Sequence, residues 1–205
     1  MSFSIGQIRL NELEGDLIYK TVVNYKPVSI VEIGTWNGLG STKCVIQAIK
    51  DSNLTTTKFV SLELYPEMYN EAICNLTDEA KYVELLNGRI IDYDETFWFD
   101  HSTIDFSKDL HAKLFFEKDL EYLKTQKNVL SSLPEYIDLL ILDGGEYSSY
   151  PEWIKLKNRT NIVILDDTAI LKCSRIREEI LFENKHEILY DNLNARNGFS
   201  IFKRK

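Results

Sequence analysis

A chain of 205 residues, of which 44% are hydrophobic and 27% charged, is long enough to bury a full core and has the composition of a soluble globular protein. Its net charge of −8 argues against a nucleic acid as the main partner, because a phosphate backbone attracts basic surfaces. The sequence shows no signal peptide, no apolar run of membrane length and no C-x-x-C pair. We therefore expect a cytoplasmic protein without a membrane segment, a zinc site or a disulfide framework.

Segments with strand and helix patterns alternate along the chain, which favours an α/β domain with a mostly parallel sheet. A helical lead-in is predicted over about 1–26, and Pro27 ends it. Further helices are predicted over 41–51, from Pro66 through MYNEAICNLTDEA, over about 106–133 and over about 171–182. Strands are predicted over 28–33, 58–64, 83–91, 136–145, 161–168, 186–190 and 199–203.

No linker or repeat divides these elements, so we predict one domain over 1–205. Residues 92–132 form an insert that is long for a connection between two strands. Its aromatic side chains could line a substrate pocket or lid, or they could pack the insert onto the body or onto a second copy in a homodimer. These side chains are Tyr93, Phe97, Trp98 and Phe99.

The segment 31–40, VEIGTWNGLG, leads from a strand into a turn with three glycines, Gly34, Gly38 and Gly40, and a helical pattern starts at Ser41. Glycine lets the backbone approach a ligand closely and adopt positive φ. The start of a helix offers free N–H groups and a partial positive charge. The turn therefore predicts a nucleotide-sized cradle, although its spacing is not that of the G-x-G-x-x-G fingerprint.

Polar side chains stand at the ends of five consecutive predicted strands, and ligands of open α/β sheets bind at this edge. Glu63 ends the second strand, where a carboxylate can accept hydrogen bonds from both hydroxyls of a ribose. Together with the glycine turn it predicts a ligand that contains adenosine. The alternative is that Glu63 is a solvated acid in a loop.

Three aspartates end the fourth and fifth strands, namely Asp143, Asp166 and Asp167. Carboxylates gathered in one place repel one another unless protons or a cation intervene, and hard oxygen ligands suit magnesium, manganese or calcium. A divalent metal site is therefore one interpretation. The other is that Asp143 and Asp166 cap the helices that follow them.

In this order and spacing, the motifs VEIGTWNGLGST, SLEL, DLLILDGGEYSSY and VILDDT resemble the class I S-adenosylmethionine-dependent methyltransferases. They are most similar to the small O-methyltransferases of the catechol and macrocin type. The resemblance covers about 28–168, and NGFSIFKR fits the last strand of that fold. It implies a Rossmann-like, doubly wound seven-stranded sheet, mostly parallel with an antiparallel last strand. It also implies O-methylation of a small hydroxylated molecule, of the sugar or natural-product type, with S-adenosylmethionine as the cofactor.

The same resemblance implies the roles of individual residues. Glu63 would hold the ribose, Gly88 and Arg89 the adenine, and the glycine turn the methionine part. The implied cofactor residues are Glu32, Gly34, Gly38, Gly40, Ser41, Thr42, Glu63, Gly88, Arg89 and Asp143. The metal-ligand positions of the metal-dependent members, which bind Mg²⁺ or another divalent cation, are matched by Asp143, Asp166 and Asp167.

The chain departs from the family pattern at the general base. Catechol-type enzymes carry a lysine three positions after the first metal aspartate, where this chain has Glu146. Macrocin-type enzymes carry an aspartate two positions after it, where this chain has Gly145. We predict Asp143 and Glu146 as the catalytic residues, with Glu146 taking the proton of the acceptor hydroxyl.

Two other classes of function stay open. The missing family base favours a binding module that holds S-adenosylmethionine without catalysis. A nicotinamide-nucleotide oxidoreductase would use Glu63 equally well for its ribose. The glycine spacing and the absence of a Tyr-x-x-x-Lys motif argue against the oxidoreductase.

Overall fold

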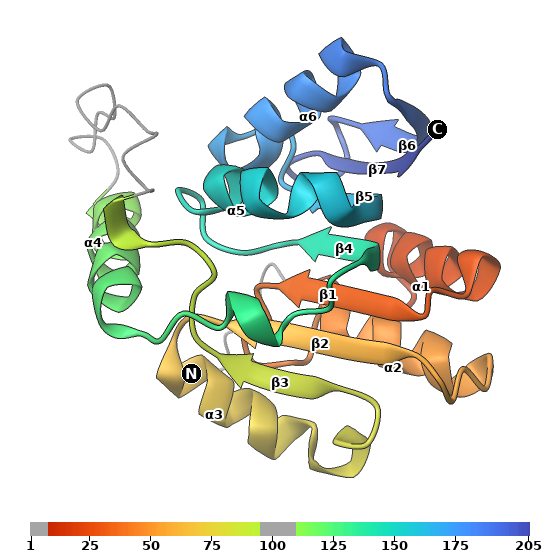
Figure 1. The fold of residues 1–205 in the computed structure, drawn as a ribbon, viewed down its shortest axis with the longest axis horizontal. Coiled ribbons are helices and arrows are strands. Elements are labelled where there is room, and N and C mark those ends of the chain that lie inside the picture. Colours follow the sequence, from red (N-terminus) through yellow and green to blue (C-terminus); the bar gives the residue numbers. More distant parts are fainter. Residues whose placement is uncertain (1–7, 95–109) are drawn as a thin grey trace.

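The computed structural model describes residues 8–94 and 110–205, and its strands form one seven-stranded sheet in the order β3-β2-β1-β4-β5-β7-β6 (Figure 1). The neighbours from β3 to β5 pair in parallel, whereas β7 runs antiparallel to both β5 and β6. The strands are β1 Ser29–Ile33, β2 Lys58–Glu63, β3 Glu84–Asn87, β4 Ile137–Leu142, β5 Thr160–Asp166, β6 His186–Asn192 and β7 Phe199–Arg204. The predicted doubly wound sheet with an antiparallel last strand is confirmed.

The strand order places a switch point between β1 and β4, at the centre of the sheet. From β1 the chain moves outward through β2 to β3, and then it returns to the other side of β1 as β4. The crossovers on the two sides of this point therefore diverge, which opens a crevice above the carboxyl ends of the strands. The loops that follow β1, β2, β4 and β5 meet at this edge.

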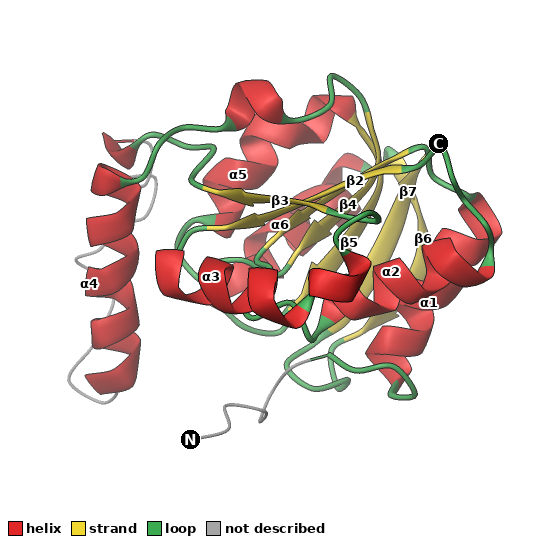
Figure 2. Cartoon of the chain, turned by 90° about the horizontal axis from the view of Figure 1, so that it is seen from below, coloured by secondary structure: helices red, strands yellow, loops and turns green. Residues whose placement is uncertain are grey.

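Helices cover both faces of the sheet, as Figure 2 shows, and each face has its own apolar core. Helices α1 and α2 contribute Ile18, Val45 and their neighbours to one core, and α5 and α6 contribute Trp153 and Ile176 to the other. Successive residues of β4 alternate between the two cores, because side chains of a strand point alternately to its two faces. The helices are α1 Leu13–Tyr25, α2 Ser41–Asp51, α3 Pro66–Asn75, α4 Leu110–Thr125, α5 Ser149–Leu156 and α6 Leu171–Glu183. No helix of the described part is long and apolar enough to cross a membrane.

The helix of the lead-in and the helix of the insert have different bounds from those predicted. Helix α1 begins at Leu13, so the described residues 8–12 of the predicted lead-in precede it, while 1–7 lie outside the described residues. Helix α4 ends at Thr125, earlier than predicted, because the chain after it turns to pair with Arg89. The Arg89 amide donates to the Lys127 carbonyl at 2.9 Å, and the Val129 amide donates to the Arg89 carbonyl at 2.8 Å. This pairing anchors the end of the insert beside β3.

The aromatic side chains predicted to form a lid or a packing surface lie only partly within the described residues. Phe97, Trp98 and Phe99 fall outside the described residues. Tyr93 packs against the core on the side of α5 and α6, with the Lys124 ammonium 4.4 Å from its ring centre. The described aromatic residue of the insert that lines the cavity above the strand ends is Phe115, on α4.

Candidate functional site

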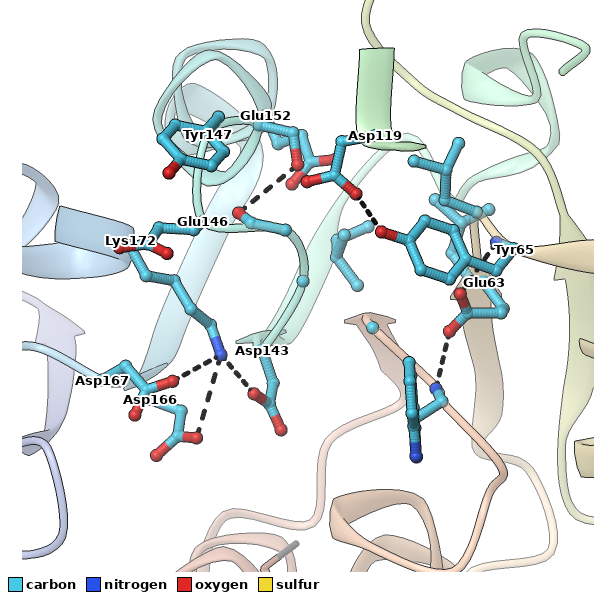
Figure 3. Close-up of a pocket in the computed structure, with 18 of the residues that line it drawn as sticks. Glu63, Tyr65, Asp119, Asp143, Glu146, Tyr147, Glu152, Asp166, Asp167 and Lys172 are labelled. Atoms are coloured by element: carbon cyan, nitrogen blue, oxygen red, sulfur yellow. Dashed lines mark hydrogen bonds and ion pairs between the residues drawn. The ribbon is translucent and has the colours of Figure 1, made fainter. Parts of the chain in front are cut away.

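A cavity of about 570 Å³ lies above the carboxyl ends of the strands (Figure 3). Its walls come from the loops after β1, β2, β3, β4 and β5, and from α4, α5 and α6. This volume is within the usual range of small-molecule sites. The predicted site residues that line it are Gly34, Glu63, Gly88, Arg89, Asp143, Glu146, Asp166 and Asp167.

Gly34 opens the turn after β1, at the switch point. Its amide and that of Thr35 both donate to the Leu62 carbonyl, at 2.9 and 3.1 Å, which ties the turn to β2. A Cβ at Gly34 would lie 2.2 Å from the Asp143 carbonyl oxygen, and its φ is +100°. Only glycine meets both conditions. The missing side chain therefore lets the ends of β1 and β4 approach each other at the cavity floor.

Glu63 closes the same turn from the end of β2. One carboxylate oxygen accepts the Trp36 amide at 2.6 Å, and the other accepts the Tyr65 amide at 2.8 Å. Burial raises the pKa of Glu63 to about 7, while these backbone hydrogen bonds act in the opposite direction. Glu63 lines the cavity, where its carboxylate oxygens can accept hydrogen bonds from a ligand.

The other predicted cofactor residues of the glycine motif, from Glu32 to Thr42, do not line the cavity. The same oxygen of Glu32 accepts the Thr42 hydroxyl at 2.6 Å and the Ser61 hydroxyl at 2.5 Å. Burial raises the pKa of Glu32 to about 7. Gly38 has φ of +79°, and a Cβ there would lie 2.7 Å from Leu76, so α3 packs directly on the turn. Of the other two predicted positions, Gly40 precedes α2 as its N-cap and Ser41 is buried in its first turn.

Replacing Thr42 by valine should lower the free energy of unfolding by about 1–3 kcal/mol, because the fully buried Glu32 loses a hydroxyl donor. Urea denaturation of the wild-type protein and the variant measures this difference. Thr42→Ser keeps the hydroxyl and is the matched control. Equal stability of the valine variant and the wild-type protein would show that Glu32 does not depend on this hydrogen bond.

Arg89 lines the cavity beyond β3, but its guanidinium is engaged in holding the neighbouring chain. The Nε group donates to the Gln126 carbonyl at 2.9 Å, and Nη1 donates to the Ile91 carbonyl at 2.7 Å and pairs with Asp92. The side chain therefore shapes the end of the cavity by fixing the segment after α4 beside Gly88.

Asp119 and Glu152 form an acidic wall of the cavity beside Glu146, and the sequence patterns did not predict it. Asp119 on α4 accepts the hydroxyl of Tyr65, which follows β2 by two residues. Burial raises the pKa of Asp119 to about 6, and the nearby charge of Glu146 adds to this rise. Burial also raises the pKa of Glu152 on α5, to about 8, and one of its oxygens has no hydrogen-bond partner in the described structure. Glu146, the predicted base, thus lies near the buried Asp119.

The three predicted metal ligands do come together, since one oxygen of each of Asp143, Asp166 and Asp167 lies within 4.8 Å of the others. A lysine stands among them. Lys172 Nζ lies 2.5 Å from Asp143, 2.9 Å from Asp167 and 3.9 Å from Asp166. Burial by itself would lower the pKa of Lys172, but the aspartates raise it above its usual value, so the ammonium is charged. The donor set with this ammonium in its centre does not fit a divalent ion.

Three residues around the aspartates were not predicted from the sequence, namely Lys172, Arg196 and Asn197. Lys172 is in the first turn of α6, where a cation opposes the helix dipole and needs a specific partner. The turn between β6 and β7 supplies Arg196, whose guanidinium lies 3.8 Å from Asp166, and Asn197, which donates to Asp167 at 3.1 Å. This turn reaches the site because the amides of Thr168 and Ala169 bond to its backbone.

No protein-family model matches the sequence, and no curated protein matches it. Solved structures share its fold. The SAH-bound methyltransferase PaMTH1 of Podospora anserina aligns with a TM-score of 0.62 at 15% identity, over 94% of this chain and 78% of that one. An O-methyltransferase from Bacillus cereus in complex with SAH (S-adenosylhomocysteine) gives 0.59 at 15% identity, over 93% and 80%. TomG of Streptomyces achromogenes, an O-methyltransferase involved in tomaymycin synthesis and solved with SAM, gives 0.58 at 14%, over 93% and 79%.

The sheet order and these alignments together define the fold of the class I S-adenosylmethionine-dependent methyltransferases. Two of these three proteins are O-methyltransferases, in agreement with the resemblance found in the sequence motifs.

Proposed function

We propose that this protein is an S-adenosylmethionine-dependent O-methyltransferase that acts on a small hydroxylated molecule. The observation that carries the proposal is the pairing of the Gly34 turn with Glu63. Both face one cavity at the switch point, in a fold whose solved relatives include complexes with SAH and SAM. That pairing supports a cofactor whose ribose is held by Glu63 and whose methionine part lies over the glycine turn.

The residues of the cavity fit the cofactor. Glu63 lines the cavity and its carboxylate can accept the two ribose hydroxyls, and Gly34 lets the ends of β1 and β4 approach each other beneath the cofactor. Gly88 and Arg89 bound the adenine end. The buried group of Glu32, Gly38, Gly40, Ser41 and Thr42 acts indirectly, by holding the turn that receives the methionine part.

S-adenosylmethionine, when bound, supplies an activated methyl group. Asp143 and Glu146 follow β4 and line the same cavity, which supports their roles in orienting the acceptor hydroxyl and accepting its proton. Most of the acceleration would come from alignment of the acceptor oxygen with the methyl group, since direct transfer needs no covalent enzyme intermediate. A small acceptor, rather than a nucleic acid, agrees with the acidic wall and the net charge of −8. A homodimer stays a prediction.

Calorimetric titration with SAH tests the proposal, with NAD as the matched control. We expect SAH to bind with a Kd of micromolar order and NAD not to bind, because the turn lacks the dinucleotide spacing. Binding of NAD alone would favour the oxidoreductase alternative, and binding of neither would overturn the cofactor assignment.

The replacement of the family base by Glu146 favours a second candidate, a module that binds S-adenosylmethionine without catalysis. Production of SAH from S-adenosylmethionine in the presence of a panel of catechols, sugars and other polyols would exclude it. Binding without turnover across such a panel would support it.

A further inference from the structure

The aspartate cluster at the ends of β4 and β5 surrounds a cation that belongs to the chain itself. Asp143 and Asp167 each accept a hydrogen bond from Lys172 Nζ, and Asp166 lies 3.9 Å from the same nitrogen (Figure 3). Three carboxylates thus direct one oxygen each toward a single ammonium. Carboxylate oxygens surround a bound metal ion in the same way, but here the ammonium nitrogen of Lys172 occupies the central position.

Lys172 is held in this position from several sides. Its side chain is 9% exposed, and a buried ammonium is stable only when carboxylates pair with it. The cluster is also fixed from the opposite side, because Asp167 accepts Asn197 with its other oxygen and Arg196 lies 3.8 Å from Asp166. Movement of the ammonium out of the cluster would leave Asp143 and Asp167 without the cation that they contact most closely.

A divalent ion would compete for the same place. Such an ion binds carboxylate oxygens at roughly 2.0–2.6 Å, so it would need the oxygens that Lys172 now contacts and the volume that Nζ fills. The two cations would also repel each other in a site with little solvent. The ammonium therefore excludes the metal by both volume and charge.

We propose that Lys172 is a built-in cation that replaces the divalent metal at the acceptor side of the cavity. The exclusion of metal stands on the cluster alone, whereas its use for an acceptor rests on the proposed methyltransferase function. Lys172 lines the cavity and has one N–H beyond its two hydrogen bonds to aspartate. That donor would position the oxygen of the acceptor, in the place where a metal would otherwise coordinate it.

Titration with Mn²⁺, followed by the electron paramagnetic resonance signal of the free ion, tests this proposal without any methyl acceptor. The wild-type protein should leave the signal of free Mn²⁺ unchanged up to about 1 mM. Lys172→Ala should bind one Mn²⁺ at least about tenfold more tightly than the wild-type protein, because the carboxylates lose their ammonium. Lys172→Arg keeps the charge and should bind none, and Lys155→Ala, which removes an exposed lysine of α5, should behave as the wild-type protein does.

A second substitution identifies the ligands. Adding Asp167→Asn to Lys172→Ala should abolish the new Mn²⁺ site. A wild-type protein that binds one Mn²⁺, and loses it with Asp167→Asn, would overturn the proposal even if Lys172→Ala did not fold. A folded Lys172→Ala variant, judged by circular dichroism, that binds no Mn²⁺ would also count against it.

Binding of SAH is measured in the same samples and separates this proposal from the proposed function. Failure of every sample to bind SAH would overturn the cofactor assignment, while the Mn²⁺ result would still decide whether Lys172 replaces a metal.

Discussion

Replacing Glu63 by alanine is expected to weaken SAH binding by about 100-fold or more. The carboxylate accepts the amides of Trp36 and Tyr65, and in the proposed complex it also accepts the ribose hydroxyls. A hydrogen bond to a charged group contributes about 1.5–3 kcal/mol, so the loss of two such bonds to the ligand already accounts for this factor. Calorimetric titration of both proteins measures the change.

The same substitution also removes an anchor of the glycine turn, so stability must be measured beside affinity. Thermal unfolding without ligand reports the loss of the two backbone hydrogen bonds. Glu71→Ala, on the exposed face of α3, removes a carboxylate far from these contacts and should leave the Kd unchanged. An alanine variant that folds and binds SAH as the wild-type protein does would exclude Glu63 from the cofactor site.

Replacing Glu152 by glutamine should stabilise the protein relative to wild type by about 2–3 kcal/mol more at pH 7.5 than at pH 5.5. Burial raises the pKa of Glu152 to about 8 from an ordinary value of 4.5. Between these two pH values the folded protein holds a proton that the unfolded chain has lost. The wild-type protein therefore loses stability as pH rises through this window, by about 1.4 kcal/mol per pH unit from this one group, whereas glutamine does not titrate.

Urea denaturation at the two pH values gives the difference directly. Glu178→Gln, which changes an exposed carboxylate of α6, is the matched control and should show the same stability difference at both pH values. A Glu152→Gln difference that is independent of pH would mean that Glu152 is ionised in the folded protein. The acidic wall would then have one more negative charge, that of Glu152, than a protonated Glu152 gives it.

The elements that the sequence predicted well are those whose signals are local. The nearly continuous apolar run in 136–145 predicts a strand buried on both faces, and the strand found there is Ile137–Leu142. Helix α2 begins and ends where the pattern after the glycine turn predicts. The insert was predicted less well, because α4 ends where the chain pairs with Arg89, a contact between residues that lie far apart in the sequence.

The cavity edge could be predicted in outline from the same local signals. A parallel sheet brings the carboxyl ends of its strands together, so Gly34, Glu63, Asp143 and Asp166 were expected at one edge, and they line one cavity. The strand pattern does not tell which motif residues face the ligand. Glu32 and Thr42 belong to the glycine motif, yet they bond to each other behind the turn.

The sequence by itself determined the order of strands and helices, the glycine turn and the acids at the strand ends, because each depends on residues that are neighbours in the chain. Only the tertiary structure decided what those acids meet. Asp119 reaches Tyr65 across 54 residues, and Lys172 reaches Asp143 across 29. Such contacts depend on how α4 and α6 pack onto the sheet, which periodicity does not specify. For that reason three aspartates read as a metal site, whereas in the fold a lysine from the next helix lies at their centre.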